Sequence, residues 1–337
     1  MNRLAESVNK QYNQPMKLLQ QQIRIESEFS GSRLDLALHQ LLPEFSRSVI
    51  QNWIKSDFIL LNRLPCQSKQ KVYGGDLIDL DIPFVAKIQD LPQKIDFNII
   101  HEDEDFYIID KPAHLVVHPA AGHQTGTLVN GLLAIDPKLE QLPRAGIVHR
   151  LDKDTTGVMV VARTLQAHAN LVDQLQRRLV KREYIAIAQG VVTAGRTIET
   201  EMARHPVNRK KMAVQPKGKH AVTHFQVAEK FPHHTYINVQ LETGRTHQIR
   251  VHLAHVHHPL LGDPLYGGRF RIPMGVQPEL GLMMKGFGRQ ALHARVLSFA
   301  HPITKEPCRF EAEIPRDFQR MLDALRASTQ SDDSKTQ

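Results

Sequence analysis

The chain has 337 residues, enough for two or three globular domains, and its 41% hydrophobic and 23% charged residues exclude a wholly disordered or fibrous protein. Its two cysteines, Cys66 and Cys308, have no CxxC spacing, which excludes a disulfide scaffold or a zinc ribbon and favours a reducing, cytoplasmic location. The net charge of +8 is compatible with a polyanionic partner, and no stretch approaches the roughly 20 apolar residues that span a bilayer.

The first compact unit is predicted over residues 23–82, after a stretch rich in Gln and Asn, residues 1–22, that is predicted to be a disordered tail. Alternating residues in 23–29 predict a short strand. Two helices follow, the first capped by Ser32, because their apolar residues recur on one face. A strand over 77–82 completes an α–β module of about 60 residues with a small core of its own.

The second unit is predicted over residues 94–325, after a linker, 83–93, that contains two prolines. Short β-rich runs alternate here with helical ones, which predicts an α+β domain with a mixed, mainly antiparallel sheet flanked by helices. The polar residues 326–337 are predicted to form a second disordered tail. The clearest strands are 106–110, 157–162, 184–188 and 236–241, and the clearest helix is 166–179.

A candidate catalytic loop lies in the segment AGIVHRLDKDTTGVMVV, 145–161, where polar residues are confined between two apolar stretches. A loop held by flanking strands presents its side chains rigidly to a ligand. Asp152 is the central candidate, with Arg150 and Lys153 beside it, because a carboxylate in this position serves as a nucleophile or a base. The alternative is an aspartate that forms a turn or a salt bridge.

Three further segments carry candidate residues. Tyr184, in KREYIAIAQG, stands at the entrance of a strand, where a phenol stacks on a base and hydrogen-bonds, or else packs in the core. Arg245, in ETGRTHQIRVHL, follows a glycine at the expected start of a helix, where it is suited to pair with a carboxylate or a phosphate. The Pro- and Gly-rich segment HPLLGDPLYGG, 258–268, is either part of this site or a loop that closes a hairpin.

Positive charge is concentrated in residues 201–220, which contain six Lys and Arg and a single acid, whereas residues 23–82 contain seven basic and eight acidic side chains. Arg209, Lys210 and Lys211 therefore predict a basic loop that contacts phosphates. The alternative is an ordinary solvated hairpin.

The N-terminal unit resembles the S4 RNA-binding domain in the segments SRLDLAL, SRSVIQNWI and GGDLI. In that family, two short helices and the loop after them present basic side chains to structured RNA. The matching residues here are Arg33, Arg47, Lys55 and Arg63. The nearly balanced charge of the unit fits the alternative, a helix pair with ordinary solvated charges.

The larger unit resembles the RluA-type pseudouridine synthase family, whose motifs occur here in that family's order as HRLDKDTTG, REY, TGRTHQIRVH, GDPLYG and LHA. The resemblance implies an isomerisation of uridine in RNA without cofactor or metal, in which the N1–C1′ bond breaks and C5 bonds to C1′. The S4-like unit and segments 110–122 and 143–150 narrow it to members that act on large-subunit (23S) ribosomal RNA. This implies a target in a stem-loop at the subunit interface and no obligate protein partner.

The resemblance also assigns roles to single residues. Asp152 is the essential carboxylate, which either takes the C2′ proton to give a glycal or attacks covalently. Tyr184 stacks on the uracil and assists proton removal at C5, and Arg245 pairs with Asp152 and keeps it ionised. Arg150 fills the gap that the extruded nucleotide leaves in the RNA, and phosphate contacts of the basic residues offset the cost of unstacking.

Three alternatives stay open at this point. A cluster of imidazoles suggests a metal site, but it contains no HExxH motif, so no metal is predicted. The cluster comprises His247, His252, His255, His257 and His258, with Asp263 nearby. A non-catalytic RNA-binding assembly factor would bind RNA without product, and a synthase for transfer RNA or for another ribosomal site would share every motif.

Overall fold

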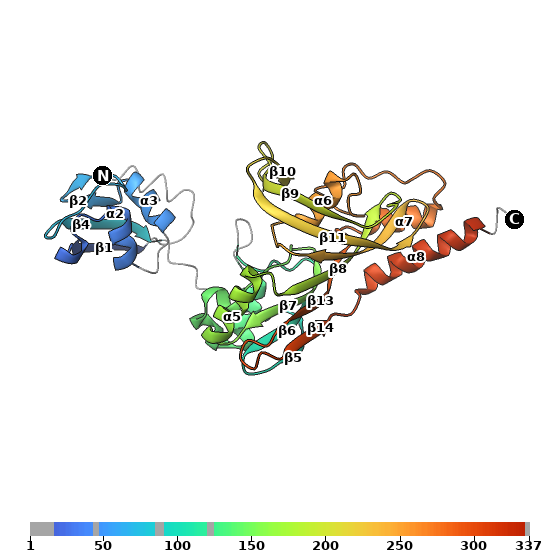
Figure 1. The fold of residues 1–337 in the computed structure, drawn as a ribbon, viewed down its shortest axis with the longest axis horizontal. Coiled ribbons are helices and arrows are strands. Elements are labelled where there is room, and N and C mark those ends of the chain that lie inside the picture. The colour runs from blue at the N-terminus through green and yellow to red at the C-terminus, as the bar shows by residue number, and fades with distance from the viewer. Residues whose placement is uncertain (1–16, 43–46, 85–90, 120–124, 334–337) are drawn as a thin grey trace. The chain divides into compact units, whose positions relative to one another are not determined.

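A computed structural model describes residues 17–42, 47–84, 91–119 and 125–333. The chain divides into two compact units, residues 1–89 and 90–337, and each has its own hydrophobic core (Figure 1). Residues 1–16, 85–90 and 334–337, which belong to the predicted tails and linker, lie outside the described residues. The two units are described separately below.

The N-terminal unit is a four-stranded antiparallel sheet, in the order β1-β4-β2-β3, that packs against two helices. The strands are β1 (Lys17–Arg24), β2 (Ile59–Leu61), β3 (Leu64–Pro65) and β4 (Leu77–Phe84), and the helices are α2 (Leu34–Leu41) and α3 (Arg47–Lys55). Leu34 and Leu38 of α2 and Ile50 and Ile54 of α3 are buried in the core, as the apolar spacing predicts, but Val49, predicted to face inward, is exposed. Arg33, not Ser32, occupies the N-cap of α2.

Three boundaries of this unit differ from the prediction, and at one of them residues 83–84, expected in the linker, belong to β4. Residues 17–22, expected in the tail, belong to β1, which pairs with β4 from Lys17–Phe84 to Arg24–Leu77. The expected strand 23–29 ends at Arg24, and a turn of 3-10 helix follows over Ser27–Phe29. Hydrogen bonds to β4 satisfy the backbone of β1 whatever its side chains are, so a glutamine-rich stretch forms a strand without apolar alternation.

The second unit contains a ten-stranded sheet in which β10-β9-β11-β12-β8-β13-β7-β6-β5 form the main path and β14 pairs with β13. All pairs are antiparallel except β7 with β13, so the predicted mixed, mainly antiparallel sheet is confirmed. The strands are β5 (Asn98–Glu102), β6 (Phe106–Lys111), β7 (Thr156–Ala162), β8 (Lys181–Gln189), β9 (Arg196–Arg204), β10 (Met212–Val214), β11 (Lys219–Lys230), β12 (His234–Leu241), β13 (Leu292–Ala300) and β14 (Pro307–Glu311).

The single parallel pair brings the start of β7 close to β13. Gly157 has a φ of +116°, and a Cβ atom there would lie 2.1 Å from the carbonyl oxygen of Ala294, so only glycine fits. The hydroxyl of Thr156 hydrogen-bonds to Nδ1 of the buried His293 on β13, at 2.9 Å. The loop that ends at β7, and that carries Asp152, is therefore anchored at its C-terminal end in the middle of the sheet.

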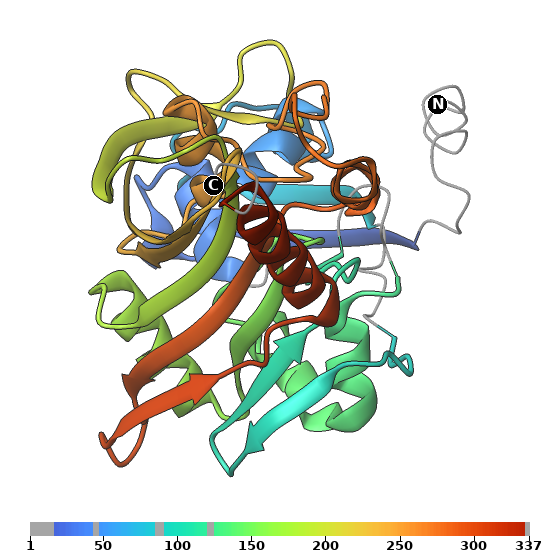
Figure 2. The ribbon, with the colours of Figure 1, turned by 90° about the vertical axis from the view of Figure 1, so that its right-hand side faces the viewer.

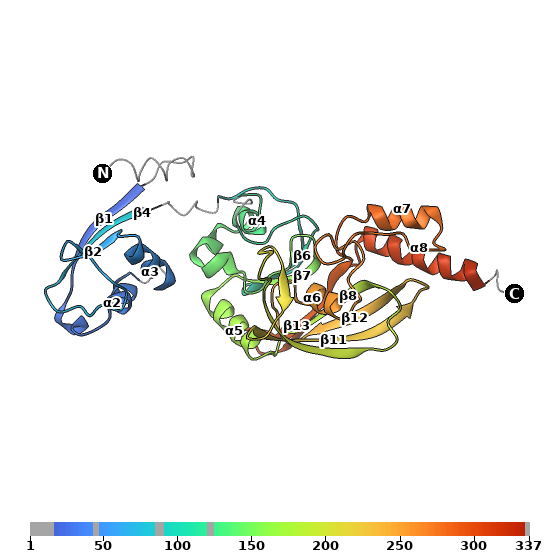
Figure 3. The same cartoon turned by 90° about the horizontal axis from the view of Figure 1, so that it is seen from above.

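Helices cover the sheet in two groups. Near β6 and β7, α4 (Leu128–Ile135) and α5 (Leu165–Gln176) pack into the largest core. In a separate cluster, α7 (Pro278–Gly286) and α8 (Arg316–Asp333) lie side by side (Figure 3), and α8 lies in front of the sheet in Figure 2. No helix in the described ranges is both long and apolar enough to cross a lipid bilayer.

Two helix ends also differ from the prediction. The helix expected over 166–179 ends at Gln176, because Arg178 adopts a left-handed conformation with φ of +61°. Residues 326–333, expected in the C-terminal tail, belong to α8, where Arg326 donates two hydrogen bonds to Glu229 of β11. This ion pair and the apolar face of α8 fix a segment whose polar composition suggested disorder.

Candidate active site

The loop before β7 is held by donors from several other segments. The ammonium group of Lys111, fully buried at the end of β6, donates hydrogen bonds to the carbonyls of Pro112, Leu115 and Lys153, at 2.7–3.0 Å. Burial lowers the pKa of Lys111 to about 7, although the nearby carboxylates of Asp154 and Asp152 raise it. The Lys111 side chain thus fixes the backbone next to Asp152.

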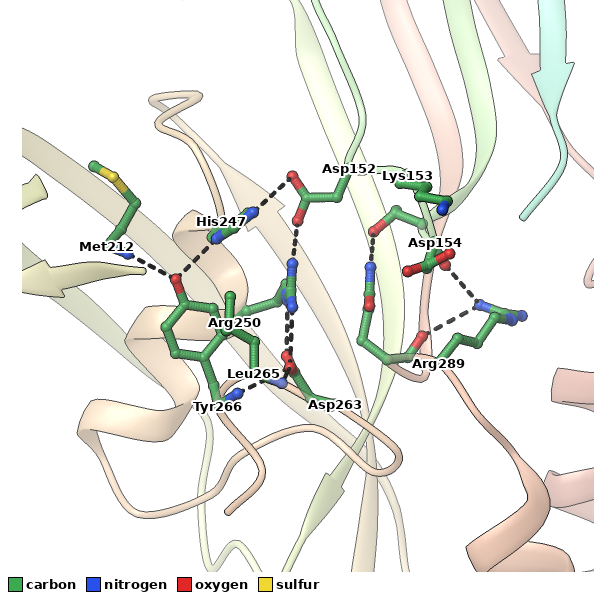
Figure 4. A network of polar contacts seen from close by, with 12 residues as sticks. Asp152, Lys153, Asp154, Met212, His247, Arg250, Asp263, Leu265, Tyr266 and Arg289 are labelled. Atoms are coloured by element: carbon green, nitrogen blue, oxygen red, sulfur yellow. Dashed lines mark hydrogen bonds and ion pairs between the residues drawn. The ribbon is translucent and has the colours of Figure 1, made fainter. Parts of the chain in front are cut away.

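Two neighbouring residues on the approach to β13, Arg289 (Figure 4) and Gln290, complete this support. Arg289, 1% exposed, donates to the carbonyl of Asp154 at 3.4 Å, and its other nitrogens bind Asp317 at the start of α8. The amide of Gln290 donates to the hydroxyl of Thr155 at 2.9 Å. The loop 152–155 is therefore fixed from three directions before any substrate arrives.

Asp152 is held through one of its two carboxylate oxygens. Arg250, on α6 (Gln248–His255), donates to Asp152 Oδ2 at 2.9 Å and sends its remaining nitrogens to Asp263, at 2.7 and 3.0 Å. In the described parts of the chain, Oδ1 has one ionisable neighbour, Nε2 of His247 at 3.9 Å, beyond hydrogen-bond distance. The Asp152 side chain is 17% exposed, so this oxygen remains accessible.

Asp263 is a buried structural counter-ion for Arg250. Besides the arginine, it accepts the backbone N–H groups of Leu265 and Tyr266, at 2.9 and 3.0 Å. Burial alone raises the pKa of the Asp263 carboxyl, but the hydrogen bonds and charge of Arg250 hold that pKa below its usual value. The same contacts keep the pKa of Arg250 above its usual value despite burial, so both groups are charged at neutral pH.

The expected pairing of Arg245 with Asp152 is wrong, because Arg250 makes this contact. Arg245 is exposed and its Nε donates to the carbonyl of His220 at 3.1 Å. The helix begins only at Gln248, whose buried amide bonds to Thr243 and Val222 and fixes the turn before it. Arg245 therefore lies on the turn outside the helix, whereas Arg250 lies on the buried side of α6.

Tyr184 lies on β8 between β12 and β13, opposite Val239 and Ala294, and is 7% exposed. Burial raises the pKa of its phenol, and the negative charge of Asp152 raises it further while Arg182 lowers it. The phenol is therefore neutral at physiological pH and lies within electrostatic reach of Asp152. Arg150 is exposed two residues before Asp152.

The predicted basic loop connects β9 to β10. Arg209 and Lys210 are exposed, and the guanidinium of Arg204 on β9 donates to the carbonyl of Arg209 at 2.9 Å. Lys211 Nζ lies 5.7 Å from the centroid of the Tyr266 ring, so the loop reaches the residues that support the active site. This proximity is invisible in the sequence, where the two residues are 55 positions apart.

Two of the four basic residues expected to contact RNA in the N-terminal unit are bound to a buried carboxylate. Asp35 is fully buried and accepts hydrogen bonds from Arg33, Arg47 and Gln51, at 2.6–3.0 Å. Arg33 and Arg47 remain partly exposed, at 35% and 42%. Lys55 and Arg63 are exposed.

The histidine cluster considered as a metal site does not converge. The ring nitrogens of His252 bond to Thr200 and Thr223, and Nδ1 of His258 lies 3.0 Å from the carbonyl oxygen of Gln189. His247 contacts Tyr266, and Asp263 binds Arg250 as described. Several of the ring nitrogens therefore bind other groups, and among the described residues this cluster does not bring three ligand atoms together.

Ligand atoms do gather elsewhere in the described ranges, at Asp103, Asp105 and His301. However, Nδ1 of His301 accepts the backbone N–H groups of Ile303 and Thr304, so the ring proton is on Nε2 and points to Asp103 at 3.4 Å. A protonated nitrogen is not a metal ligand, so this group is a hydrogen-bonded turn.

Sequence reasoning missed most of the residues that support Asp152. Arg250 shares a motif with Arg245, and the presence of two arginines there was a signal that either of them pairs with the aspartate. Asp263 and Tyr266 lie in the Pro- and Gly-rich segment, whose polar residues were a second signal. Nothing in the sequence around Lys111 indicates that its ammonium group is buried.

Comparison with known proteins agrees with this architecture. Residues 105–255 match the family described as RNA pseudouridylate synthase. The structure of human RNA pseudouridylate synthase domain containing 4 is 27% identical, with a TM-score of 0.54 over 68% of this chain and 93% of that one. Human RNA pseudouridylate synthase domain containing 1, at 22% identity and a TM-score of 0.51, has the same fold. The fold is that of RNA pseudouridine synthases.

Other proteins are more similar in sequence to this chain, and their similarity extends over both units. Ribosomal large subunit pseudouridine synthase D of Xanthomonas campestris is 48% identical over 94% of this chain and 96% of its own length. The protein of the same name from Escherichia coli is 49% identical over 88% and 91%. The chain therefore belongs to the RluA-type pseudouridine synthases, which are intramolecular isomerases.

Proposed function

We propose that this enzyme converts uridine to pseudouridine in large-subunit (23S) ribosomal RNA, in a stem-loop at the subunit interface, and that Asp152 is the essential catalytic residue. The observation that supports the proposal most directly is that only one oxygen of the Asp152 carboxylate is hydrogen-bonded. Arg250 binds Oδ2, and Oδ1 stays accessible on a rigid loop. The choice of RNA is supported by the name shared by relatives that match both units. A cytoplasmic location follows from this substrate.

The isomerisation breaks the N1–C1′ bond and forms the C5–C1′ bond, while C5 loses a proton and N1 gains one. Asp152 Oδ1 acts on the sugar, either by taking the C2′ proton or by adding to C1′. Arg250 contributes by fixing the carboxylate at Oδ2, since two hydrogen bonds to Asp263 prevent the guanidinium from moving. The loop contacts of Lys111 and Gln290 add to this pre-organisation.

Tyr184 provides a face for the detached uracil and assists proton removal at C5. Its neutral phenol and its position within the sheet suit this role, because the ring is held by the flanking strands. Arg150, exposed next to the site, fills the space that the extruded nucleotide leaves. Arg245 lies on the turn before α6, and we assign it to RNA contact rather than to Asp152.

RNA is held by exposed or partly exposed basic groups on both units. Arg209, Lys210 and Lys211 contact phosphates near the active site. Lys55 and Arg63 do so on the N-terminal unit, where Arg33 and Arg47 are held in place by Asp35. A fixed guanidinium loses less conformational entropy when it binds a phosphate, which supports a role in recognising structured RNA.

The direct test incubates purified enzyme with a large-subunit ribosomal RNA transcript and maps pseudouridine by chemical sequencing. The wild type should modify the transcript, and Asp152→Asn should lower the rate by at least about 10³-fold while RNA affinity changes little. Asp154→Asn is the matched control, since it removes a carboxylate two residues away and should keep activity within a few-fold. Retained turnover in Asp152→Asn would refute the catalytic role.

The same mapping distinguishes the alternatives. Ribosomal RNA from cells that lack the protein should lose specific pseudouridines. Loss confined to transfer RNA would assign the enzyme to a different substrate, and RNA binding without any product would make the protein a non-catalytic assembly factor. Each of these outcomes would overturn the proposed substrate or activity.

The role of the N-terminal unit in RNA binding is tested by removing positive charges from it. Lys55→Ala with Arg63→Ala should weaken binding to structured ribosomal RNA and reduce the slope of log Kd against log salt by about 2, with little effect on the rate at saturating enzyme. Lys138→Ala with Lys285→Ala is the matched control, because it removes the same charge from exposed positions of the other unit. Equal losses in both pairs would contradict a specific role.

A further inference from the structure

The hydroxyl of Tyr266 joins the basic loop to the active site. It accepts the backbone N–H of Met212, the first residue of β10, at 2.8 Å, and it contacts Nδ1 of His247 at 2.8 Å (Figure 4). The ring of Tyr266 also faces the cations of Lys211, at 5.7 Å, and Arg250, at 5.1 Å. One side chain therefore contacts the phosphate-binding loop and two residues next to Asp152.

The surroundings of His247 favour one protonation pattern. The tyrosine oxygen accepts the Met212 N–H, and the tyrosine can donate its own proton to Nδ1 of the imidazole. The ring proton of neutral His247 is then on Nε2, which faces Asp152 Oδ1 at 3.9 Å. The opposite tautomer would direct a lone pair at the carboxylate, which is electrostatically unfavourable.

The backbone at His247 is shaped to hold this position. His247 is the N-cap of α6 and adopts a left-handed conformation, with φ of +57°, which is costly for a residue with a Cβ atom. Its side chain is only 19% exposed, between Tyr266 and Asp152. Other backbone conformations would avoid this cost. The left-handed conformation is therefore stronger evidence than the exposed fraction that the position of the His247 side chain beside Asp152 matters.

We propose that His247 is a positioning residue for Asp152 Oδ1, and that the Tyr266 hydroxyl makes its action depend on the docking of the basic loop. Arg250 fixes Oδ2, and the Nε2–H of His247, 3.9 Å from Oδ1, favours one orientation of the carboxylate by electrostatic attraction rather than through a hydrogen bond. When Lys211 and its neighbours bind phosphates, the Met212–Tyr266–His247 chain is held in register. The inference rests on the proposed function, which it extends from the residues of the reaction to their coupling with RNA binding.

The first experiment removes the hydroxyl and keeps the ring. Tyr266→Phe should lower the single-turnover rate at saturating enzyme by about tenfold, with less than a twofold change in Kd for a large-subunit ribosomal RNA transcript. Tyr236→Phe is the matched control, because it removes a phenol oxygen in the cluster beside α8, away from the site, and should leave the rate unchanged. An unchanged rate in Tyr266→Phe, with an active wild type, would overturn the inference.

A double-mutant cycle separates this role from a structural one. His247→Ala should slow the reaction at least as much as Tyr266→Phe, and combining the two should slow it no further. His247→Gln should recover part of the rate, since its amide nitrogen reaches the position of Nε2 without help from Tyr266. Additive losses, or no recovery by glutamine, would contradict the proposed chain of contacts.

The link to RNA binding is tested with two lysines. Lys211→Met and Lys285→Met remove the same charge, but only Lys211→Met should lower the rate at saturation, because Lys285 is exposed on α7 and has no proposed role in RNA binding. That loss should vanish in Tyr266→Phe. Equal effects of the two lysines on the rate would overturn the coupling. An inactive wild type on ribosomal RNA would instead refute the proposed function itself.

Discussion

Each unit of the molecule contains an aspartate paired with arginine. The two aspartates differ in how many of their carboxylate oxygens accept hydrogen bonds. Asp35, in the N-terminal unit, is fully buried, and donors from Arg33, Arg47 and Gln51 reach both of its oxygens. Asp152 is 17% exposed, and Arg250 reaches only one. Pairing with arginine is therefore common to both aspartates, and they differ in that the proposed catalytic residue has one oxygen without a hydrogen bond to the described residues.

The electrostatic environment of Asp35 agrees with this difference. Burial alone would raise the pKa of Asp35, yet the hydrogen bonds from Gln51, Arg33 and Arg47 hold it below its usual value. A carboxylate stabilised in this way is a poor base. Asp263 follows the same pattern as Asp35, so both are structural carboxylates, whereas we propose that the second oxygen of Asp152 is left for the substrate.

The largest effect is expected from breaking the support of the reactive carboxylate. Arg250→Met leaves Asp263 buried without its counter-ion, and should lower the free energy of unfolding by about 3–5 kcal/mol. It should also slow the reaction by about 10²-fold, because Asp152 loses its orientation. Thermal unfolding and single-turnover assays measure the two effects. Adding Asp263→Asn should restore stability but not activity, and restored activity would show that orientation is not the role of Arg250.

Lowering the pH should destabilise the second unit much more than the N-terminal unit. Burial lowers the pKa of His234, His252 and His293 to about 4, so they are neutral in the folded protein and titrate near 6.5 when unfolded. Each favours unfolding as the pH falls below 6.5, by about 2 kcal/mol between pH 7 and pH 5. Eighteen of the 19 histidines lie in the second unit.

The measurement uses the single tryptophan, Trp53 of α3, which packs against the core of the N-terminal unit and whose fluorescence therefore reports on that unit alone. Denaturant unfolding at pH 7 and pH 5 should show a loss of stability by far-ultraviolet circular dichroism and almost none by tryptophan fluorescence. Equal losses by both probes would show that the histidines do not account for the acid sensitivity.

A smaller effect on stability is expected at Asp35, both of whose carboxylate oxygens accept hydrogen bonds. Asp35→Asn keeps the shape and removes the charge, so Arg33 and Arg47 lose an ionic partner, and the N-terminal unit should be destabilised by about 1–2 kcal/mol in the tryptophan signal. Turnover of a saturating minimal substrate should be unchanged. A loss of turnover comparable to that of Asp152→Asn would abolish the distinction between the two aspartates.

The smallest effect is expected at Arg245. Because it binds a backbone carbonyl on the surface and not Asp152, Arg245→Met should change the saturated rate by less than about threefold, and its effect should be confined to RNA affinity. Arg250→Met, in the same motif, provides the direct comparison. A large loss in the rate with Arg245→Met would mean that the substrate brings this arginine to the carboxylate.

The sequence was sufficient for features that depend on local pattern. The apolar spacing of Leu34, Leu38, Ile50 and Ile54 predicted the inner faces of both N-terminal helices, and the apolar stretches on either side of Asp152 placed it in a loop. The ends of elements were less predictable, because β1 is lengthened by its partner strand and α8 by an ion pair with Glu229. Those contacts join residues that are far apart in the chain.

What the sequence determined by itself was the class of the sheet, the family motifs and the choice of Asp152, because these follow from periodicity and from residues close together in the chain. Only the tertiary structure decided that Arg250 and not Arg245 binds Asp152, and that Lys111, His247 and Tyr266 support it. Which side chains meet depends on where α6 begins and on the packing of the strands. Those positions are set by hydrogen bonds and burial across the whole sheet, which no short segment encodes.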